Sequence, residues 1–165
     1  MANSFYPIQT GNRWKYSLST GGDTTNEITE SGTDYYIIKS SSSEKSTRVK
    51  LENGKHISDS FEEGNFQTVF IDNAQVGDSW EINYKANGID SILKMKVLEI
   101  QPNKEIEGKN YQDVMLIEGE SVFSMNGNEI PSGMKTQYYY AKNVGAVLTT
   151  SSLGDYMPLV ECKLN

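Results

Sequence analysis

Aromatic side chains are the residues of this sequence whose type and spacing most suggest chemistry. Trp80 and Tyr84 fall on one side of a segment with two-residue periodicity, and Tyr138 and Tyr140 do so in a later segment. Because alternate residues of a strand point to one face of a sheet, each pair would form an aromatic row. Such rows either fill a core or line a site for a small apolar or sugar-like ligand. We therefore predict four ligand-binding residues: Trp80, Tyr84, Tyr138 and Tyr140.

Acidic residues offer a second kind of chemistry, because Glu118 and Glu120 lie two residues apart on one face of an expected strand. Glycoside hydrolysis requires two carboxyl groups held at a suitable separation across a cleft. The chain contains 22 acidic residues, so a pair at this spacing also arises by coincidence. A carboxylate-dependent glycoside hydrolase is therefore the second alternative function.

Other patterns typical of an enzyme or a metal site are missing from the sequence. The single histidine, His56, follows a turn and lacks a nucleophile motif such as Gly-x-Ser-x-Gly, so we expect it to be exposed at a strand end. Cys162 is the only cysteine and is expected to be a small buried residue of the last strand. No acidic calcium loop or phosphate-binding glycine loop is present. We predict no catalytic residue, no metal ligand and no cofactor.

The charge of the chain is moderately negative, with a net charge of -7 and a pI near 4.8 in 165 residues. The acidic residues are scattered, which is typical of a solubilising surface, whereas nucleic acids attract basic patches. We expect no nucleic-acid partner. No stretch of about 18 apolar residues predicts a membrane span, and the first eleven residues lack the basic and apolar parts of a signal peptide.

Alternation of polar and apolar residues dominates the chain, and the spacing of an amphipathic helix is almost absent. Period-two stretches bounded by Gly, Asn, Asp and Ser recur from end to end, which predicts an all-β fold. We expect about ten or eleven strands. They fall within residues 13–20, 25–31, 34–40, 46–52, 66–72, 79–85, 91–100, 111–125, 135–142, 145–152 and 156–164.

The segments between these stretches carry specific turn signals. Asn53-Gly54 suits the left-handed conformations of a type I′ hairpin, and the serine-rich stretch 40–47 is expected to be a hairpin loop. Residues 101–110 are expected to be a loop, because Pro102 removes a backbone donor and its neighbours are polar. Pro158 favours an edge position or the first residues of the last strand.

The connections are too short to hold crossover helices, so the strands should follow one another as an antiparallel meander. A sheet of this many strands would leave long exposed edges unless it curls or closes. We therefore predict a single domain, residues 1–165, that forms a curved up-and-down barrel or half-barrel of calycin-like type. The alternative is a two-sheet β-sandwich.

A short phrase occurs twice, as Gln-Thr-Gly-Asn-Arg-Trp at 9–14 and as Gln-Val-Gly-Asp-Ser-Trp at 75–80, with an offset of 66 residues. Glycine permits the positive φ that reverses the chain, Asn or Asp bonds nearby backbone, and the Trp covers one end of the core. The phrase is therefore interpreted as the start of a strand. A duplication that produced two similar halves is a further hypothesis.

Three segments together carry a resemblance to a group of bacterial proteins. The opening contributes Tyr6, Pro7, Gly11, Asn12, Trp14 and Tyr16, the middle contributes residues 76–80, and the late segment contributes Tyr139, Tyr140, Ala141, Val144 and Gly145. They resemble uncharacterised, lipoprotein-like, β-rich proteins of the bacterial envelope. The resemblance implies an extracytoplasmic location, in the periplasm or at the cell surface, and a β-rich fold with no established activity.

The aromatic rows, the strand count and the lack of catalytic groupings together favour a binding function. We predict a non-enzymatic extracytoplasmic module that binds a small apolar or sugar-like ligand, or a protein partner of the envelope. The first alternative is a structural or assembly component of the cell envelope, which would engage other chains through an exposed sheet face or edge.

Overall fold

The computed structural model describes residues 3–32 and 34–165, and these residues form one sheet of twelve β-strands. The strands are β1 (Arg13–Ser17), β2 (Asp23–Ser31), β3 (Tyr36–Ser40), β4 (Thr47–Glu52), β5 (Lys55–Ser58), β6 (Gln67–Ile71), β7 (Ser79–Ala86), β8 (Ile89–Ile106), β9 (Lys109–Met125), β10 (Asn128–Ala141), β11 (Gly145–Ser151) and β12 (Tyr156–Lys163). The described part of the chain contains no helix that is long and apolar enough to cross a membrane.

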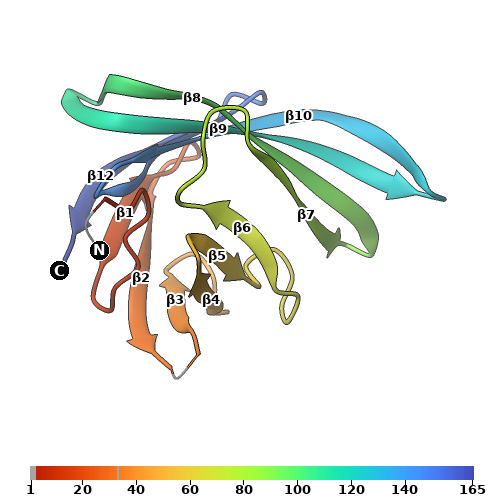
Figure 1. Ribbon diagram of the computed structural model, residues 1–165, viewed down its shortest axis with the longest axis horizontal. Helices are drawn as coiled ribbons and strands as arrows, with labels where there is room; N and C mark the ends of the chain where they lie inside the picture. Colours follow the sequence, from red (N-terminus) through yellow and green to blue (C-terminus); the bar gives the residue numbers. More distant parts are fainter. Residues whose placement is uncertain (1–2, 33) are drawn as a thin grey trace.

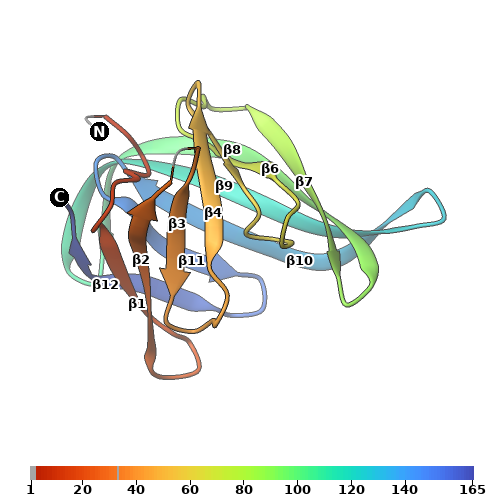
Figure 2. The same ribbon diagram turned by 90° about the horizontal axis from the view of Figure 1, so that it is seen from below.

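The strand order in the sheet is β6-β5-β4-β3-β2-β1-β12-β11-β10-β9-β8-β7. Each strand therefore pairs with its neighbours in the chain, except that β6 and β7 are the two edges, and β12 returns to pair with β1. Figures 1 and 2 show the sheet strongly bent, so that β1–β6 face β7–β10 across an interior. This architecture confirms the prediction of a curved antiparallel meander, with Lys55–Ser58 as an additional strand.

Residues 101–110 are not a loop, so this prediction is wrong. They extend the β8–β9 hairpin as far as the turn at Gly108. Pro102 is tolerated because it and Asp113, the residue opposite it in β9, form no regular backbone pair. The backbone of Asp113 is left-handed, with a φ of 51°. In addition, β7 pairs with β8 only as far as Lys96, so β8 is an edge strand at the proline. Edge positions tolerate proline, because no ladder hydrogen bond requires its missing N–H.

The predicted turns are confirmed. Asn53 and Gly54 both have positive φ, 51° and 80°, as a type I′ hairpin requires. The serine-rich stretch connects β3 to β4. Pro158 is the third residue of β12, where the pairing partner changes from β11 to β1.

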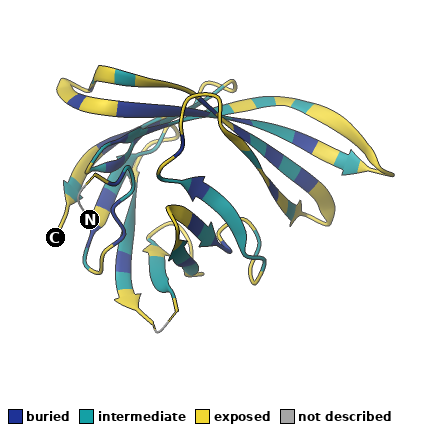
Figure 3. Cartoon of the chain, viewed as in Figure 1, coloured by how far each residue is buried: buried dark blue, intermediate teal, exposed yellow. Residues whose placement is uncertain are grey.

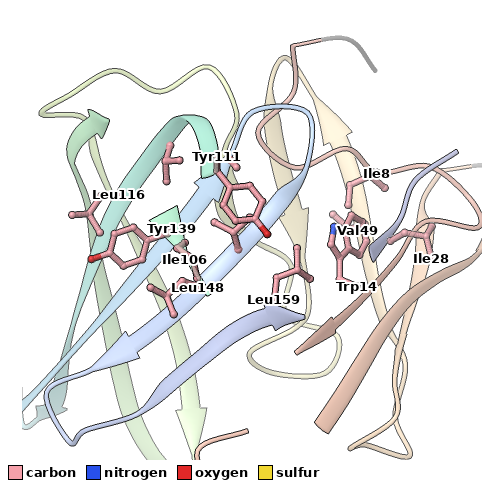
Figure 4. Close-up of a cluster of buried hydrophobic side chains, with 13 residues drawn as sticks. Ile8, Trp14, Ile28, Val49, Ile106, Tyr111, Leu116, Tyr139, Leu148 and Leu159 are labelled. Carbon is pink, nitrogen blue, oxygen red and sulfur yellow. The ribbon is translucent and has the colours of Figure 1, made fainter. Parts of the chain in front are cut away.

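Two clusters of buried side chains form the core. Figure 3 shows where the buried residues lie along the strands. The first surrounds Trp14, whose exposed fraction is 1%, and continues outward to Tyr139 and Leu116, which lie side by side in Figure 4. The far end of the β8–β9 hairpin contributes Ile106 and Tyr111 to this cluster. The second cluster lines the inner faces of β7, β8 and β9. It consists of Phe70, Ala74, Ile82, Leu93, Met95, Val97, Met115 and Ile117.

The repeated phrase folds in the same way at both places. In each copy the amide of the fourth residue donates to the carbonyl of the first, at 3.0 and 2.9 Å. The glycines, Gly11 and Gly77, have φ of 92° and 95°. Their amides donate to a carbonyl of residue 28 in β2 and residue 97 in β8, at 2.8 and 2.9 Å. In both places the phrase thus reverses the chain and aligns the strand that follows it with the next strand of the sheet, β1 with β2 and β7 with β8.

The opening and late segments that carry the family resemblance meet in space. The indole N–H of Trp14 donates to the carbonyl of Val144 at 2.7 Å, and the hydroxyl of Tyr16 donates to the carbonyl of Ala146 at 2.9 Å. Gly145 lies between these carbonyls with a φ of 114°, and a Cβ there would be 2.8 Å from the Trp14 ring nitrogen. Only glycine fits this position, because both the backbone conformation and the approach of the ring exclude a side chain.

Candidate functional site

The N-terminal segment lies across one end of the bent sheet and is fixed to both of its halves. The carbonyl of Ser4 accepts a hydrogen bond from the amide of Asn143 at 2.6 Å, and the amide of Phe5 donates to Asp72 Oδ1 at 2.6 Å. Asn143 follows β10, whereas Asp72 follows β6. These bonds position the next residue, Tyr6, inside the sheet.

Tyr6 contacts aromatic rings from four strands. Its ring centroid lies 5.5 Å from that of Trp14, 5.4 Å from His56, 6.1 Å from Phe70 and 5.8 Å from Tyr140. The contacts with Trp14 and Phe70 are edge-on, and the His56 ring is stacked on Tyr6. Offset and edge-to-face arrangements are the favoured ones for aromatic pairs. This aromatic cluster closes one end of the interior.

A cavity of about 270 Å³ opens beside this cluster and is called the tyrosine cavity here. Four tyrosines from the N-terminal segment, β1 and β10 contribute to its wall. The residues that line it are Tyr6, Tyr16, Tyr138, Tyr140, Thr24, Asn26, Ala146, Thr149 and Met157. No charged side chain is among them, so the wall combines aromatic surfaces with neutral hydrogen-bonding groups.

The tyrosine hydroxyls of the cavity keep their protons at physiological pH. Burial raises the pKa of Tyr6 to about 12 and raises the pKa of Tyr140 still further above its ordinary value. Burial likewise raises the pKa of Tyr138, which a hydrogen bond with Thr136 partly opposes. The hydroxyls are therefore neutral groups that can both donate and accept a hydrogen bond.

The structure brings together two of the four predicted site residues, Tyr138 and Tyr140. Tyr84 lies apart from them, beside a different surface hollow, where its ring centroid is 5.3 Å from that of Phe61. Trp80 packs against the second core cluster, and its indole N–H is buried without a hydrogen-bond partner in the described residues. The aromatic row on β7 thus lies outside the tyrosine cavity.

Tyr6, Tyr16 and Asn26 belong to the same cavity and are missing from the sequence-based prediction. Tyr6 precedes the first strand, so no alternation marks the direction of its side chain. Tyr16 shares a face with Trp14 in β1, and this two-residue spacing is a signal that could have identified it. Asn26 is a polar residue in an alternating strand, where polar residues usually face solvent.

His56 is buried, with an exposed fraction of 2%, so the expectation of an exposed histidine is wrong. The N-terminal segment covers it, and its Nε2 atom lies 3.7 Å from Asp72 Oδ2. Burial raises the pKa of Asp72, but the neighbouring His56 side chain and hydrogen bonds from the Ser4 hydroxyl and the Phe5 amide lower it below its usual value.

This group does not form a nucleophilic triad. In a triad the histidine lies between the hydroxyl and the carboxylate. Here the Ser4 hydroxyl donates directly to the carboxylate of Asp72, and His56 Nε2 lies 3.7 Å from the same carboxylate oxygen. In the described residues, no three histidine, cysteine, aspartate or glutamate side chains converge on a possible metal position. Cys162 is a free thiol, half-buried in β12.

Glu118 and Glu120 lie on the outer face of β9. Both carboxylates are 3.8 Å from the ammonium group of Lys135. Gly119, between them, points inward, where a Cβ would meet Leu93 and Met95 side-chain atoms at 3.0 Å. Because alternate residues face opposite ways, the two glutamates point away from the tyrosine cavity and form part of a charged outer surface.

Comparison with known proteins gives matches of fold. No family model and no curated protein matches the chain. Two solved bacterial structures share its architecture. One is named "a putative lipoprotein" from Parabacteroides distasonis, with a TM-score of 0.55 and 16% identity, covering 99% of this chain and 100% of the other. The other is named "a putative exported protein with YmcC-like fold" from Bacteroides fragilis, with a TM-score of 0.56, 11% identity and the same coverage.

Proposed function

We propose that this chain is a non-enzymatic extracytoplasmic module that binds a small ligand in the tyrosine cavity. The cavity itself carries the proposal, because it combines four tyrosines with a neutral polar wall. Pockets for small molecules typically pair apolar and aromatic walls with a few well-placed polar groups. The location is supported by the two structures of similar fold, whose names describe a lipoprotein and an exported protein.

The wall of the cavity suits a ring-shaped ligand of low charge. Ring faces of tyrosine pack against apolar or sugar-like rings. The hydroxyls of Tyr6 and Tyr140 form no hydrogen bond with another described residue, so they are free to bond a ligand. A sugar-like ligand would satisfy these hydroxyls, whereas a purely apolar ligand would leave them bonded to water alone. The sugar-like class is therefore favoured.

The test is a comparison of two tyrosine variants with two probes. Glucose and N-phenyl-1-naphthylamine, a neutral apolar dye, are titrated by calorimetry and by fluorescence. Tyr140→Ala should weaken binding about tenfold or more, because it removes a ring from the wall. Tyr84→Ala is the matched control and should leave the affinity unchanged, since Tyr84 lies outside the cavity. Failure of both probes to bind would contradict the proposal.

Assembly with another envelope protein is a second candidate function, and one surface feature favours it. Apolar side chains are exposed near the tip of the β9–β10 hairpin, where Phe123, Met125 and Ile130 have exposed fractions of 37%, 53% and 44%. Phe123 and Ile130 are direct neighbours across the two strands. The double variant Phe123→Ser and Ile130→Ser should then abolish capture of a partner from envelope extracts while ligand binding is retained.

A further inference from the structure

A second cavity adjoins the tyrosine cavity on the inner faces of β2–β5. It has a volume of about 330 Å³, and it shares Tyr6 and Asn26 with the tyrosine cavity. It is called the serine cavity here, because five of its lining residues bear aliphatic hydroxyls. They are Ser40, Ser43, Thr47, Ser58 and Ser60. The two cavities therefore lie side by side and share Tyr6 and Asn26 as part of their walls.

Several polar groups on this wall have no protein partner. The side-chain amide of Asn26 and the hydroxyls of Thr47 and Ser60 form no hydrogen bond with any residue of 3–32 or 34–165. None of the three is sealed from solvent, in contrast to the hydroxyl of Thr29. An amide offers two donors and an acceptor, and a hydroxyl offers one donor and two acceptor positions. The wall can therefore satisfy several ligand hydroxyls.

The polar lining is continuous from one cavity to the other. The hydroxyl of Thr24, in the tyrosine cavity, lies 3.3 Å from that of Ser40, in the serine cavity. Ser40 in turn lies 3.0 Å from the hydroxyl of Ser42. Asn26 stands at the junction, next to Tyr6, and reaches both spaces. A ligand that crosses the junction would meet hydrogen-bonding groups along its whole length.

The wall carries no charge that is free to pair with an ionised ligand. Besides Tyr6, whose hydroxyl is neutral, the titratable groups of the serine cavity are Lys45 and His56. The Lys45 ammonium is 2.9 Å from the Glu63 carboxylate, and His56 faces Asp72. A carboxylate or phosphate ligand requires an unpaired cation, because burying an unpaired charge is costly. The lining therefore selects a neutral ligand.

The size of the two cavities together indicates a ligand longer than one ring. Small-molecule pockets have volumes of roughly 300–1,000 Å³. The tyrosine cavity alone lies just below this range, and the serine cavity alone lies at its lower limit. A ligand that occupied both cavities would use a volume well inside this range.

We propose that the serine cavity is a second subsite, and that the ligand is a neutral oligosaccharide with at least two rings, one in each cavity. One ring packs against Tyr138 and Tyr140, and the next ring places its hydroxyls against Thr47 and Ser60. The Asn26 amide bonds the groups close to the linkage. This inference rests on the proposed function, because it assigns the ligand class of the same concave site.

The experiment compares disaccharides with their monosaccharides by isothermal titration calorimetry. Maltose, cellobiose and di-N-acetylchitobiose are measured beside glucose and N-acetylglucosamine. At least one disaccharide should bind about tenfold or more tightly than its monosaccharide. The double variant Thr47→Val and Ser60→Ala should bring the affinity of that disaccharide close to that of the monosaccharide, whose own affinity stays within about twofold.

Thr25→Val is the matched control. Thr25 is a threonine of β2, but it lines a groove on the outer face together with Arg13 and Lys15, away from both cavities. It should change neither affinity. Equal affinities for disaccharides and monosaccharides, an inactive double substitution, or no binding of any sugar would overturn the second subsite. If the apolar dye still binds and Tyr140→Ala abolishes its binding, the proposed function survives that result. If neither dye nor sugar binds, both proposals fail.

Discussion

Asp59 is the carboxylate with the largest number of hydrogen bonds in the described structure. It accepts from the Arg48 amide at 2.8 Å, from Arg48 Nη2 and Nε at 2.9 and 3.2 Å, and from the Gly64 amide at 3.2 Å. Its exposed fraction is 5%. These bonds join β4 to the segment between β5 and β6, and they fix the course of that segment beside the serine cavity.

Replacement of this carboxylate should destabilise the fold. Asp59→Ala should lower the free energy of unfolding by about 2 kcal/mol, because hydrogen bonds to a charged group contribute about 1.5–3 kcal/mol and Arg48 remains partly hydrated. Urea denaturation measures the change. Asp23→Ala is the control, since Asp23 forms only an exposed pair with Lys15 at 3.6 Å and should lose less than about 1 kcal/mol. Equal losses in the two variants would contradict this assignment.

Two carboxylates should also govern stability in acid. Burial by itself raises the pKa of Asp59, but hydrogen bonds from Arg48 and Gly64 lower it below its usual value, and Asp72 is lowered in a similar way. A carboxyl whose folded pKa is lowered binds protons more readily in the unfolded state. Its stabilisation is therefore complete above the unfolded pKa and is lost as the pH falls through the folded pKa.

Stability should accordingly be level at neutral pH and should fall below about pH 4, the unfolded pKa of aspartate. Urea denaturation at a series of pH values provides the measurement. In Asp59→Asn, which cannot titrate, the decrease with acid should be smaller than in the unmodified protein. Parallel curves for the two proteins would show that Asp59 is not responsible.

The candidate site could be only partly predicted from single residues, and the reason is long-range packing. Alternation correctly placed Tyr138 and Tyr140 on one face, because it is a local property of the backbone. It did not reveal that Tyr84 would lie outside the cavity, since the location of a hollow depends on which strands face each other. His56 is buried because Tyr6, fifty residues earlier, stacks on it. No local pattern records such a contact.

At the level of strands, the seam between β6 and β7 is the unusual element. These two edges share no backbone ladder, although seven residues connect them. Side chains bridge the gap instead: Asn65 donates to the Asn83 carbonyl at 2.9 Å, and the Lys85 amide donates to Glu62 Oε1 at 3.1 Å. The Asn83 amide donates to Gln67 Oε1 at 3.4 Å. These bonds occupy an edge that would otherwise invite pairing with another chain.

Loss of one bridging side chain should loosen this edge locally. Glu62→Ala removes the acceptor of the Lys85 amide and a partner of Asn65, which lies 3.0 Å away. Amide hydrogen exchange at Lys85 and Asn83 should then accelerate about tenfold or more, while amides of β11 keep their rates. Glu62→Gln retains an acceptor and should exchange more slowly than Glu62→Ala. Unchanged exchange in Glu62→Ala would show that the seam is held by other contacts.

Most strands and turns could be predicted because their signals are local. Asn-Gly pairs require positive φ at both positions and therefore mark hairpins such as the one at Asn53. For 101–110 the local signals wrongly predict a loop, because Pro102 lacks a backbone donor and its neighbours are polar. The strand tolerates Pro102 because β7 pairs with β8 only as far as Lys96. The extent of that pairing follows from the sheet topology and not from the local sequence.

For the whole molecule, the strand order divides the chain into two sets of six, β1–β6 and β7–β12. Each set begins with the same turn phrase, with matching hydrogen bonds. The two junctions between the sets differ, however. β12 pairs with β1 through a backbone ladder that places Trp14 opposite Cys162 and contains a bulge between Lys15 and Tyr16. In the described residues β6 and β7 share no such ladder and are bridged by side chains. A duplication of the chain is still a hypothesis. The barrel is closed by backbone pairing between β12 and β1 and is open, without backbone pairing, between β6 and β7.

This asymmetry predicts where the chain can be opened. The first described residues and the C-terminal strand lie on the same side of the molecule (Figure 1), and the Asn165 amide donates to Asn12 Oδ1, just before β1, at 2.7 Å. A circular permutant that joins the ends by a short Gly-Ser linker and opens between Gln75 and Val76 breaks no strand pairing, because the cut falls in the exposed β6–β7 connection. It should retain native near-ultraviolet circular dichroism and ligand binding, with a loss of roughly 1–2 kcal/mol from the broken turn. A permutant that fails to fold would show that this connection, rather than the β12–β1 pairing, holds the sheet in its closed shape.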